Sequence, residues 1–549
     1  MSKIKIFALG GLNEMGKNMY VVEVNKDIFV FDAGLKYPDD TMLGVDYLIP
    51  NFDYLKNNKT RIKGIFVTHG HDEQMGAICD ILEFLPKIKV YGTKFTLDVI
   101  KKEMQESNQD YKKYNLMEIK PHQKISFREN SIFPISLTHD VPEAVGYVLN
   151  TKDGSIVYTS NFVFDSTMQT YYKTDIGKLA YIGKQNVLCL LSESIYATKE
   201  GFTAPSNRTY DLLKSTINKY DKRILYNVFQ NQLYRIQELF DALIQTHRNI
   251  VVLGKALEKL IYDSIDNGYL KFDKERILPL SHINDNNIVV IISDEREKAF
   301  SNLKRIVKGY DKFLKLTSED TLVFASPIYD GLEKDSTKLF DDVSKIGCNL
   351  VIVSKKYKSF HASIEDLMMM INLMQPKYYF PVIGEYRHQV ANKELALKLN
   401  MNEENILLKL NGQVVYFENG VLKDNNEIIP TSDILIDGNT SSDIGELVIK
   451  DREMLADNGI VVVVATLDKK TKQILAGPEI LTRGFVYVKD NIDLIKESSS
   501  LAINVINNNV TNNYVDYNKI RNQIREVLGD YFMDETECRP MILTVIGEV

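Results

Sequence analysis

The feature that most constrains the fold is a short apolar strand that ends in a histidine. The stretch GIFVTH, residues 64–69, reaches His69, and His71 follows after a single glycine. Similar strands alternate with helical patterns along the first part of the chain, and most polar candidate residues come directly after them. Layered α/β folds place their ligands at that edge of a sheet, so we predict an α/β protein with a site around these histidines.

Length and composition are typical of a multidomain globular protein. At 549 residues the chain is long enough for two to four domains, and 44% apolar with 26% charged residues is ordinary for globular proteins. No apolar run approaches the ~20 residues of a membrane span, and the opening MSKIKIFALGG leads into a strand without a signal-peptide pattern. The four cysteines are far apart and form no C-x-x-C pair. We therefore expect reduced thiols, a cytoplasmic location and no membrane.

The net charge of −7 gives no support to nucleic-acid binding, because nucleic-acid binders usually have a basic footprint. It does not exclude such binding either, since a local groove can be basic on an acidic protein. The total charge leaves this question open.

Composition and periodicity divide the chain into segments. Residues 1–205 have an α/β pattern, and residues 206–360 alternate helices with strands such as RILYNVF and NIVVIIS. Residues 361–422 follow with a helix and the strand KYYFPVIG. Residues 423–445 are rich in Asn, Asp, Ser, Thr and Gly, which is typical of a linker. Residues 446–549 combine the strands GIVVVVATLD, FVYV and MILTVIGEV with a helix around 516–529 and indicate a small α+β domain.

Several motifs in order along the chain resemble bacterial ribonuclease J. They are ALGGLNEMGKNMYVVE, FDAGLKYPDDTMLGVDYLIP, LTHDVPEAVGYVLNTKDGSIVYTSNFVFD, LLSESIYATKEGFTAPS, PVIGEYRH and PEILTRGFVYV. The resemblance implies a metallo-β-lactamase αββα sandwich in two parts, 1–205 and 361–422. It also implies a β-CASP α/β domain inserted at 206–360 and, at 446–549, a C-terminal domain through which the family assembles.

The metal ligands that the resemblance implies are only partly present. His69, His71 and His139 occupy the family positions that bind one metal, whereas Asn161 replaces the bridging aspartate of a T-G-D motif. The second metal would need the positions now held by Glu73, Gln74, Asn161 and Ile383, where the family motif H-x-H-x-D-H and the P-V-H-G-E loop are broken. Amide oxygens are poor zinc ligands, and isoleucine has no ligand atom. We expect at most one zinc or manganese ion; the alternative is that the histidines are hydrogen-bonded packing residues without metal.

The residues that the resemblance assigns to catalysis and substrate contact are also partly retained and partly replaced. The resemblance gives Glu73, Glu193 and His361 as catalytic residues with residual activity at best, and it places Ser359, His361 and Ser363 beside the substrate. A general-acid histidine is replaced by Tyr234, whose reference pKa near 10 suits proton transfer at neutral pH poorly. Phe360 replaces the glycine of the family's S-G-H motif.

The family's glycine-rich loop for the 5′ nucleotide aligns with ISDEREKAF, residues 292–300. Asp294, Glu295 and Glu297 would repel a phosphate there unless they point away; the simpler interpretation is a charged, solvated helix start. Asp46 and Asp443 match positions where the family can hold a structural cation.

Three functional hypotheses follow. The first is a weak or inactive ribonuclease J paralogue that acts as a subunit or modulator of a motif-complete ribonuclease J, as a hetero-oligomer or as a homodimer. The second is a working metal-dependent 5′–3′ exo- or endoribonuclease that tolerates the replacements. The third is an RNA-binding protein without catalysis. All three predict RNA as a partner, and a co-purifying ribonuclease J, two equivalents of metal or salt-dependent RNA binding would distinguish them.

Overall fold

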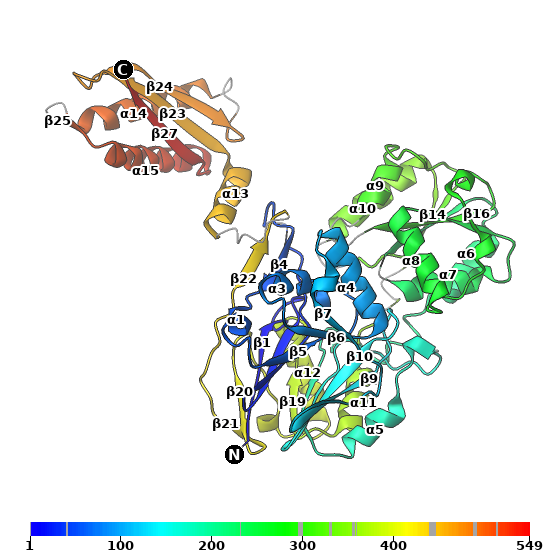
Figure 1. Ribbon diagram of the computed structural model, residues 1–549. Coiled ribbons are helices and arrows are strands. Elements are labelled where there is room, and N and C mark those ends of the chain that lie inside the picture. Colours follow the sequence, from blue (N-terminus) through cyan, green and yellow to red (C-terminus); the bar gives the residue numbers. More distant parts are fainter. Residues whose placement is uncertain are drawn as a thin grey trace. The chain divides into compact units, whose positions relative to one another are not determined.

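The computed structural model describes most of the chain (Figure 1). The described residues are 2–39, 42–168, 170–230, 232–294, 300–328, 332–353, 357, 359–438, 446–486, 491–511 and 514–549. The chain divides into two compact units, one formed by Met1–Tyr37 with Asp46–Ser441 and the other by Pro38–Val45 with Ser442–Val549. None of the helices in the described part has the length and apolar character that a membrane span requires.

Two sheets form the centre of the first unit. One sheet runs in the order β21 (Val421–Lys423), β20 (Val415–Glu418), β1 (Lys3–Gly10), β2 (Met19–Val24), β3 (Asp27–Phe31), β5 (Ile62–Phe66), β6 (Lys89–Gly92) and β7 (Asn115–Glu118). The other runs in the order β19 (Tyr378–Pro381), β12 (Val187–Ser192), β11 (Gly154–Tyr158), β10 (Val145–Thr151), β9 (Asn130–Ser136) and β8 (Ile125–Phe127). Strand β12 pairs in parallel with β11 and β19, and its six residues VLCLLS are all buried, which explains its unbroken apolar run.

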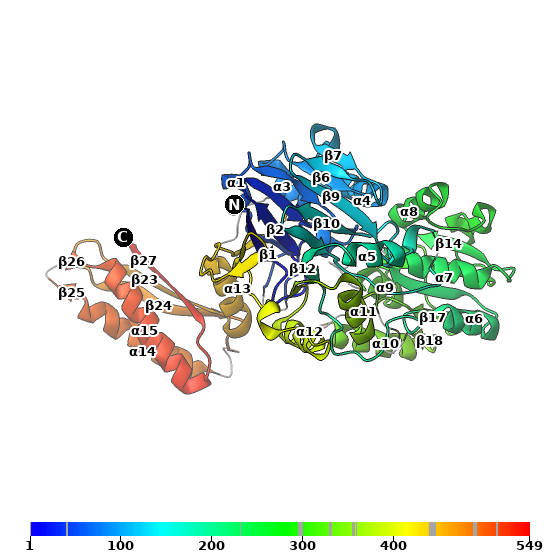
Figure 2. The same cartoon turned by 90° about the horizontal axis from the view of Figure 1, so that it is seen from below.

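The two sheets pack face to face through aromatic side chains. Tyr147 of β10 lies 5.8 Å from Phe31 and 5.7 Å from Phe66 between ring centroids. The outer face of the first sheet is covered by α3 (Ile78–Phe84) and α4 (Lys94–Glu106). The outer face of the second is covered by α5 (Ile176–Gly183), α11 (Ile364–Met374) and α12 (Tyr386–Lys398). This layering confirms the predicted αββα sandwich (Figures 1 and 2).

A parallel sheet is inserted between β12 and α11. Its order is β15 (Ile277–Leu278), β14 (Asn249–Leu253), β16 (Ile288–Asp294), β13 (Ile224–Phe229), β17 (Thr321–Phe324) and β18 (Asn349–Ile352). Helices α6 (Tyr210–Lys219), α7 (Leu233–Leu243) and α8 (Lys255–Asp266) cover one face, while α9 (Ser301–Val307) and α10 (Glu333–Ile346) cover the other. Residues that follow β13 and β18 therefore lie at the carboxyl edge of this sheet.

The second unit is a small α+β domain. Strand β23 (Ile460–Leu467) lies between β24 (Ile474–Arg483) and β27 (Met541–Glu548), and α14 (Ile492–Asn508) and α15 (Tyr517–Thr536) pack on one face (Figures 1 and 2). Alternate residues of β23 are buried, as expected for a sheet covered on one side. The helix predicted around 516–529 is confirmed as α15, whereas α14 was not anticipated. The predicted strand FVYV, 485–488, lies partly outside the described residues.

The predicted linker, residues 423–445, is not entirely irregular. Its segment Asp433–Ile436 forms β22, which pairs antiparallel with β4 (Tyr47–Pro50). The pairing buries the apolar end of the strand at Ile436, and the Asp433 carboxylate forms an ion pair with the buried Lys17. This part of the segment therefore belongs to the first unit. The other domain boundaries remain predictions.

Candidate metal centre

Three histidines from two strand ends meet at one point of the first unit. His69 follows β5, His71 precedes α2 (Asp72–Met75), and His139 follows β9. One nitrogen from each side chain lies within 4.8 Å of the others. Ring centroids are 4.5 Å apart for His69 and His139, and 4.9 Å apart for each pair that includes His71.

The protonation and hydrogen bonding of these rings fit one metal ion. Burial, with the neighbouring histidines, lowers the pKa of His69 well below its ordinary value. Burial also lowers the pKa of His139 to about 3, although Asp140 opposes the change. Both rings are therefore neutral, the form that binds metals. Within the described residues, His69 Nε2 and His139 Nε2 are buried without a hydrogen-bond partner, while His69 Nδ1 lies 3.0 Å from the Thr68 hydroxyl.

Two buried aspartates support the histidines and were missed in the sequence. Asp140 Oδ1 lies 3.2 Å from His71 Nε2 and 3.3 Å from His139 Nδ1. Burial raises the pKa of Asp140, but the two histidines outweigh it and leave the pKa below its ordinary value. Its position directly after His139 was the signal that could have found it.

Asp32 supports the strand end that precedes His69. It accepts hydrogen bonds from the Thr68 backbone N–H at 2.8 Å and the Tyr158 hydroxyl at 2.7 Å. Burial raises the pKa of Asp32 to about 7 against these hydrogen bonds. Carboxylates that hold ligand-bearing segments in this way fix the orientation of the ligands. The signal in the sequence was the polar residue at the end of the apolar run IFVF.

The positions that would share or hold a second metal carry amides. Asn161 Oδ1 and both amide atoms of Gln74 are buried, and no described residue hydrogen-bonds to them. Neither residue supplies negative charge. Glu73, the remaining carboxylate of this set, is half-buried in α2. The structure thus brings the retained histidines together, whereas Gln74 and Asn161 leave buried amide groups without partners among the described residues.

Ile383 combines an unusual backbone conformation with an apolar side chain that cannot bind a metal. Its φ is 54°, in the left-handed region that β-branched residues rarely adopt. Two hydrogen bonds hold it there: its N–H donates to the Tyr20 hydroxyl at 3.2 Å, and its carbonyl accepts from Ser194 N–H at 3.0 Å. The side chain is 1% exposed and joins the core between the sheets. Such strain costs about 1–3 kcal/mol and persists because the surroundings enforce it.

Glu193 connects three segments through one buried carboxylate. Oε1 accepts hydrogen bonds from the N–H groups of Phe162 at 2.8 Å and Ala362 at 3.0 Å. Oε2 lies 2.9 Å from His361 Nδ1. The residue is fully buried, so its contacts are structural and orient His361. The ring of His361 is 6.3 Å from that of His139, which places it beside the metal centre.

An aromatic cluster fills the space next to His361. We define it as Val163, Met168, Tyr172 and Phe360, with Tyr171 and Tyr234 packed against it. Tyr234 contacts Tyr172 at 5.5 Å and Phe360 at 5.4 Å between ring centroids, and Phe360 lies 6.3 Å from His139. Burial raises the pKa of Tyr234 above its ordinary value. The two replacements Tyr234 and Phe360 therefore pack against each other beside the metal centre.

The remaining predicted residues have identifiable positions. Ser359 N–H donates to the Tyr196 hydroxyl at 3.3 Å. Ser363 is fully buried and caps α11, so its hydroxyl faces the interior. Asp294 is also buried, and its carboxylate accepts from Asn227 and Asn302, which directs it inward. Asp46 accepts from the Gly438 N–H at 2.8 Å. The predictions for Glu295, Glu297 and Asp443 fall outside the described residues.

Known family models match four successive segments of the chain. They are the beta-lactamase superfamily domain at 29–177, the ribonuclease J beta-CASP domain at 221–343, the Zn-dependent metallo-hydrolase RNA specificity domain at 352–406 and the ribonuclease J C-terminal domain at 447–549.

Full-length relatives agree with these matches. Ribonuclease J2 of Bacillus subtilis (strain 168) is 35% identical over 550 residues, covering 100% of this chain and 99% of the relative. Ribonuclease J 2 of Staphylococcus aureus (strain NCTC 8325 / PS 47) is 33% identical, covering 100% and 98%. A crystal structure of a protein of unknown function from Enterococcus faecalis V583 has a TM-score of 0.54 at 14% identity, covering 76% of this chain and 100% of that one, which indicates a shared fold. The chain belongs to the ribonuclease J family.

Proposed function

We propose that this ribonuclease J-like protein of RNA processing hydrolyses RNA weakly or not at all, and acts as a subunit or modulator of a motif-complete ribonuclease J. The observation that carries the proposal is the loss of ligand chemistry at three of the four positions that would hold a second metal. Gln74 and Asn161 offer only amides there, and Ile383 is buried in the core. Two divalent ions about 3.5–4 Å apart need an anionic ligand between them. The bridging position carries Asn161, whose side chain has no negative charge.

The substrate side supports the same proposal. The aromatic cluster places Phe360 and Tyr234 beside His139 and His361. A phosphodiester is polar and charged, so an apolar wall there is unfavourable for its approach. The raised pKa of Tyr234 makes its hydroxyl a still poorer proton donor or acceptor at neutral pH.

A slow single-metal nuclease is the second candidate. It is favoured by the converging nitrogens of His69, His71 and His139, which would hold one zinc or manganese ion, and by the lowered pKa values of His69 and His139. Such an ion supplies a bound water of lowered pKa. In this alternative His361, oriented by Glu193, is the residue placed to move a proton near the metal centre.

The second unit supports assembly with another chain. The face of its sheet away from α14 and α15 carries Leu481, Leu543 and Val545, which are between 44% and 52% exposed. They lie beside the half-buried Val462 and Val464 of β23. A continuous apolar face of this kind is typical of interfaces between subunits. A motif-complete ribonuclease J or a second copy of this chain would cover it.

We expect the purified chain to degrade 5′-monophosphorylated RNA no faster than a His69→Ala/His71→Ala variant, with manganese, magnesium or zinc present. The variant removes two of the three nitrogen ligands and reports contaminating nuclease. A motif-complete ribonuclease J serves as the positive control in the same assay. Activity that is present in the chain and lost in the variant would support the single-metal nuclease instead.

The partner is tested separately. Co-expression of the tagged chain with a motif-complete ribonuclease J is expected to yield a stable complex. Leu543→Glu/Val545→Glu, on the open face of the sheet, is expected to lower the yield of that complex at least about ten-fold, because it places charges in an apolar interface. Asn522→Glu/Met533→Glu adds the same charge at two exposed positions of α15, away from the open face of the sheet, and is the matched control. Equal yields for all three proteins would contradict the assignment of this face.

A further inference from the structure

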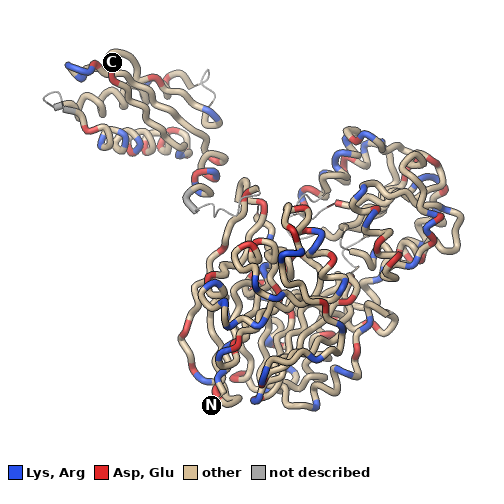
Figure 3. Tube along the Cα trace, viewed as in Figure 1, with Lys and Arg blue, Asp and Glu red and all other residues tan. Residues whose placement is uncertain are grey.

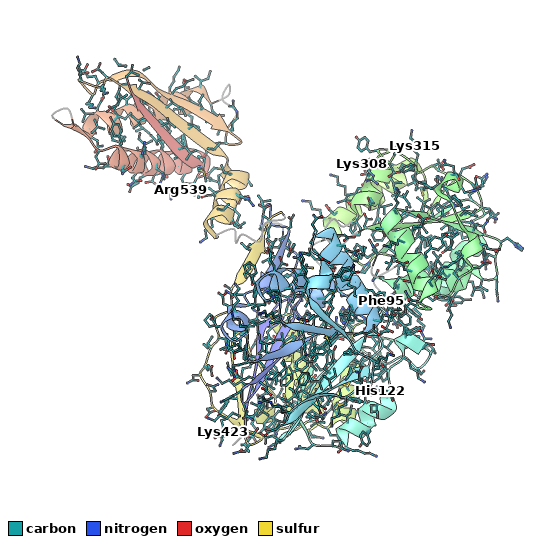
Figure 4. All side chains as sticks on the ribbon, in the orientation of Figure 1. Phe95, His122, Lys308, Lys315, Lys423 and Arg539 are labelled. Carbon is teal, nitrogen blue, oxygen red and sulfur yellow. The ribbon has the colours of Figure 1, made fainter. Side chains whose placement is uncertain are left out.

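The segment between α9 and β17 presents a local basic surface on an acidic protein. Lys308, Lys312 and Lys315 are exposed, and within the described residues none of them has an ion-pair partner. The two neighbouring cations are paired, Lys304 with Asp335 of α10 and Arg305 with the buried Asp311. The lysines belong to the outer part of the inserted domain, where Figure 4 labels Lys308 and Lys315 and Figure 3 shows blue segments close to α9.

Two aromatic rings stand among these lysines. Tyr310 is 78% exposed and Phe313 is 48% exposed. The Lys312 ammonium lies 5.5 Å from the centroid of the Phe313 ring. Large aromatic side chains normally withdraw from water, so two exposed rings interleaved with unpaired lysines indicate a binding surface. We call Lys308, Tyr310, Lys312, Phe313 and Lys315 the α9 loop patch.

Buried polar groups hold the loop in this conformation. The Asp311 carboxylate accepts hydrogen bonds from the N–H groups of Phe313 at 2.8 Å and Leu314 at 2.9 Å, and from Arg305. The buried Arg223 guanidinium donates to the Lys315 carbonyl at 2.9 Å and pairs with Asp320. The rings are therefore presented by a fixed backbone, which lowers the entropic cost of binding.

The patch lies away from the metal centre. Tyr234 follows β13 and Phe360 follows β18, so the aromatic cluster is at the carboxyl edge of the parallel sheet. The α9 loop patch follows α9 and precedes β17, which places it at the amino edge. A ligand on the patch does not need to enter the space beside the histidines.

We propose that the α9 loop patch binds single-stranded RNA. Unpaired lysines attract the phosphate backbone, and exposed rings stack on bases without requiring a particular sequence. This combination matches a flexible nucleic acid better than an acidic protein surface, which offers carboxylates but few flat rings. The inference does not depend on whether the metal centre cleaves RNA. It assigns RNA contact to a surface outside the cleft.

The test measures binding of a fluorescein-labelled oligouridylate with a 5′ hydroxyl to the full-length chain, by fluorescence anisotropy in EDTA over a series of KCl concentrations. Lys308→Gln/Lys312→Gln/Lys315→Gln is expected to reduce the slope of log K against log salt by about 2, because each phosphate contact contributes about 0.7 for single strands. Tyr310→Ala/Phe313→Ala is expected to weaken binding at least about five-fold with little change in the slope.

The matched control removes the same charge elsewhere. Lys59→Gln/Lys87→Gln/Lys89→Gln changes three exposed lysines at the amino edge of the first sheet: Lys59 precedes β5, Lys87 precedes β6 and Lys89 is the first residue of β6. Its affinity is expected to stay within about two-fold of the unmodified chain, as surface charges at a distance are largely screened. The proposal is overturned if the unmodified chain does not bind the oligonucleotide, if the patch variants bind normally, or if the control loses as much affinity as they do. Loss of a ribonuclease J partner with normal RNA binding would assign the patch to protein contact.

Discussion

Replacing Glu193 with alanine is expected to lower the free energy of unfolding of the first unit by about 2–6 kcal/mol. The change removes the acceptor for the N–H groups of Phe162 and Ala362, both of which are then buried and unsatisfied. Each orphaned donor costs about 1–3 kcal/mol. The carboxylate also holds His361 at 2.9 Å, so its loss frees that ring. Urea denaturation followed by circular dichroism and tyrosine fluorescence measures the effect.

Glu193→Gln is the matched control for this prediction. Glutamine keeps a side-chain oxygen of the same reach, so the two backbone N–H groups retain an acceptor, and only the charge opposite His361 is lost. We expect a cost of about 1–2 kcal/mol, clearly less than for alanine. If alanine and glutamine destabilise the unit equally, the contact with His361 accounts for most of the contribution of Glu193 to stability. If neither change has an effect, Glu193 is not the structural connection that its hydrogen bonds indicate.

The fold was largely predictable because its signals are local. The apolar runs in GIFVTH and VLCLLS predict strands from adjacent residues alone, and the structure confirms these strands as β5 and β12. The alternation of strands and helices in residues 206–360 likewise specified a parallel sheet. The second unit was harder. Helix α14 has a serine-rich middle, SSS at residues 498–500, and an asparagine-rich end, so tertiary packing rather than propensity stabilises it.

The candidate site was predictable only where the type of residue alone indicates its role, as it does for metal-binding histidines. His69, His71 and His139 were expected together, and their nitrogens converge. The pairing of Tyr234 with Phe360 was not expected, because it joins residues far apart in the chain through ring contacts that no local pattern records. The roles of Asp32 and Asp140 were missed although both residues stand at conspicuous places in the sequence, because their contacts with Tyr158 and His71 join segments far apart in the chain.

Glu193 and Ser363 illustrate a second limit of the sequence. Residue type suggested catalysis and substrate contact, respectively, whereas their burial shows that both also satisfy backbone groups and helix ends. A carboxylate or a hydroxyl can serve either purpose, and only its surroundings distinguish the two.

Restoring the family ligands is expected to create a second metal site. The variant Glu73→Asp/Gln74→His/Asn161→Asp/Ile383→His should bind two zinc ions per chain, whereas the unmodified chain should bind one at most. Asn161→Asp supplies the shared negative charge, and the two new imidazoles supply neutral nitrogen ligands. The backbone at position 383 already has a φ of 54°, which histidine adopts more readily than isoleucine. Metal analysis of the dialysed proteins gives the stoichiometry.

The control variant keeps the first three changes and carries Ile383→Leu, which preserves an apolar side chain in the core and supplies no ligand. It is expected to bind no second ion tightly, since the added site then lacks one of its two new nitrogen donors. Two ions in the control would mean that Ile383 is not what blocks the site. One ion or none in the full variant would mean that ligand identity is insufficient, and that the aromatic cluster around Phe360 also excludes the metal. Adding Phe360→Gly/Tyr234→His to the full variant would then separate these causes, because it removes the two contacting rings of Phe360 and Tyr234 from the cluster while leaving every ligand in place.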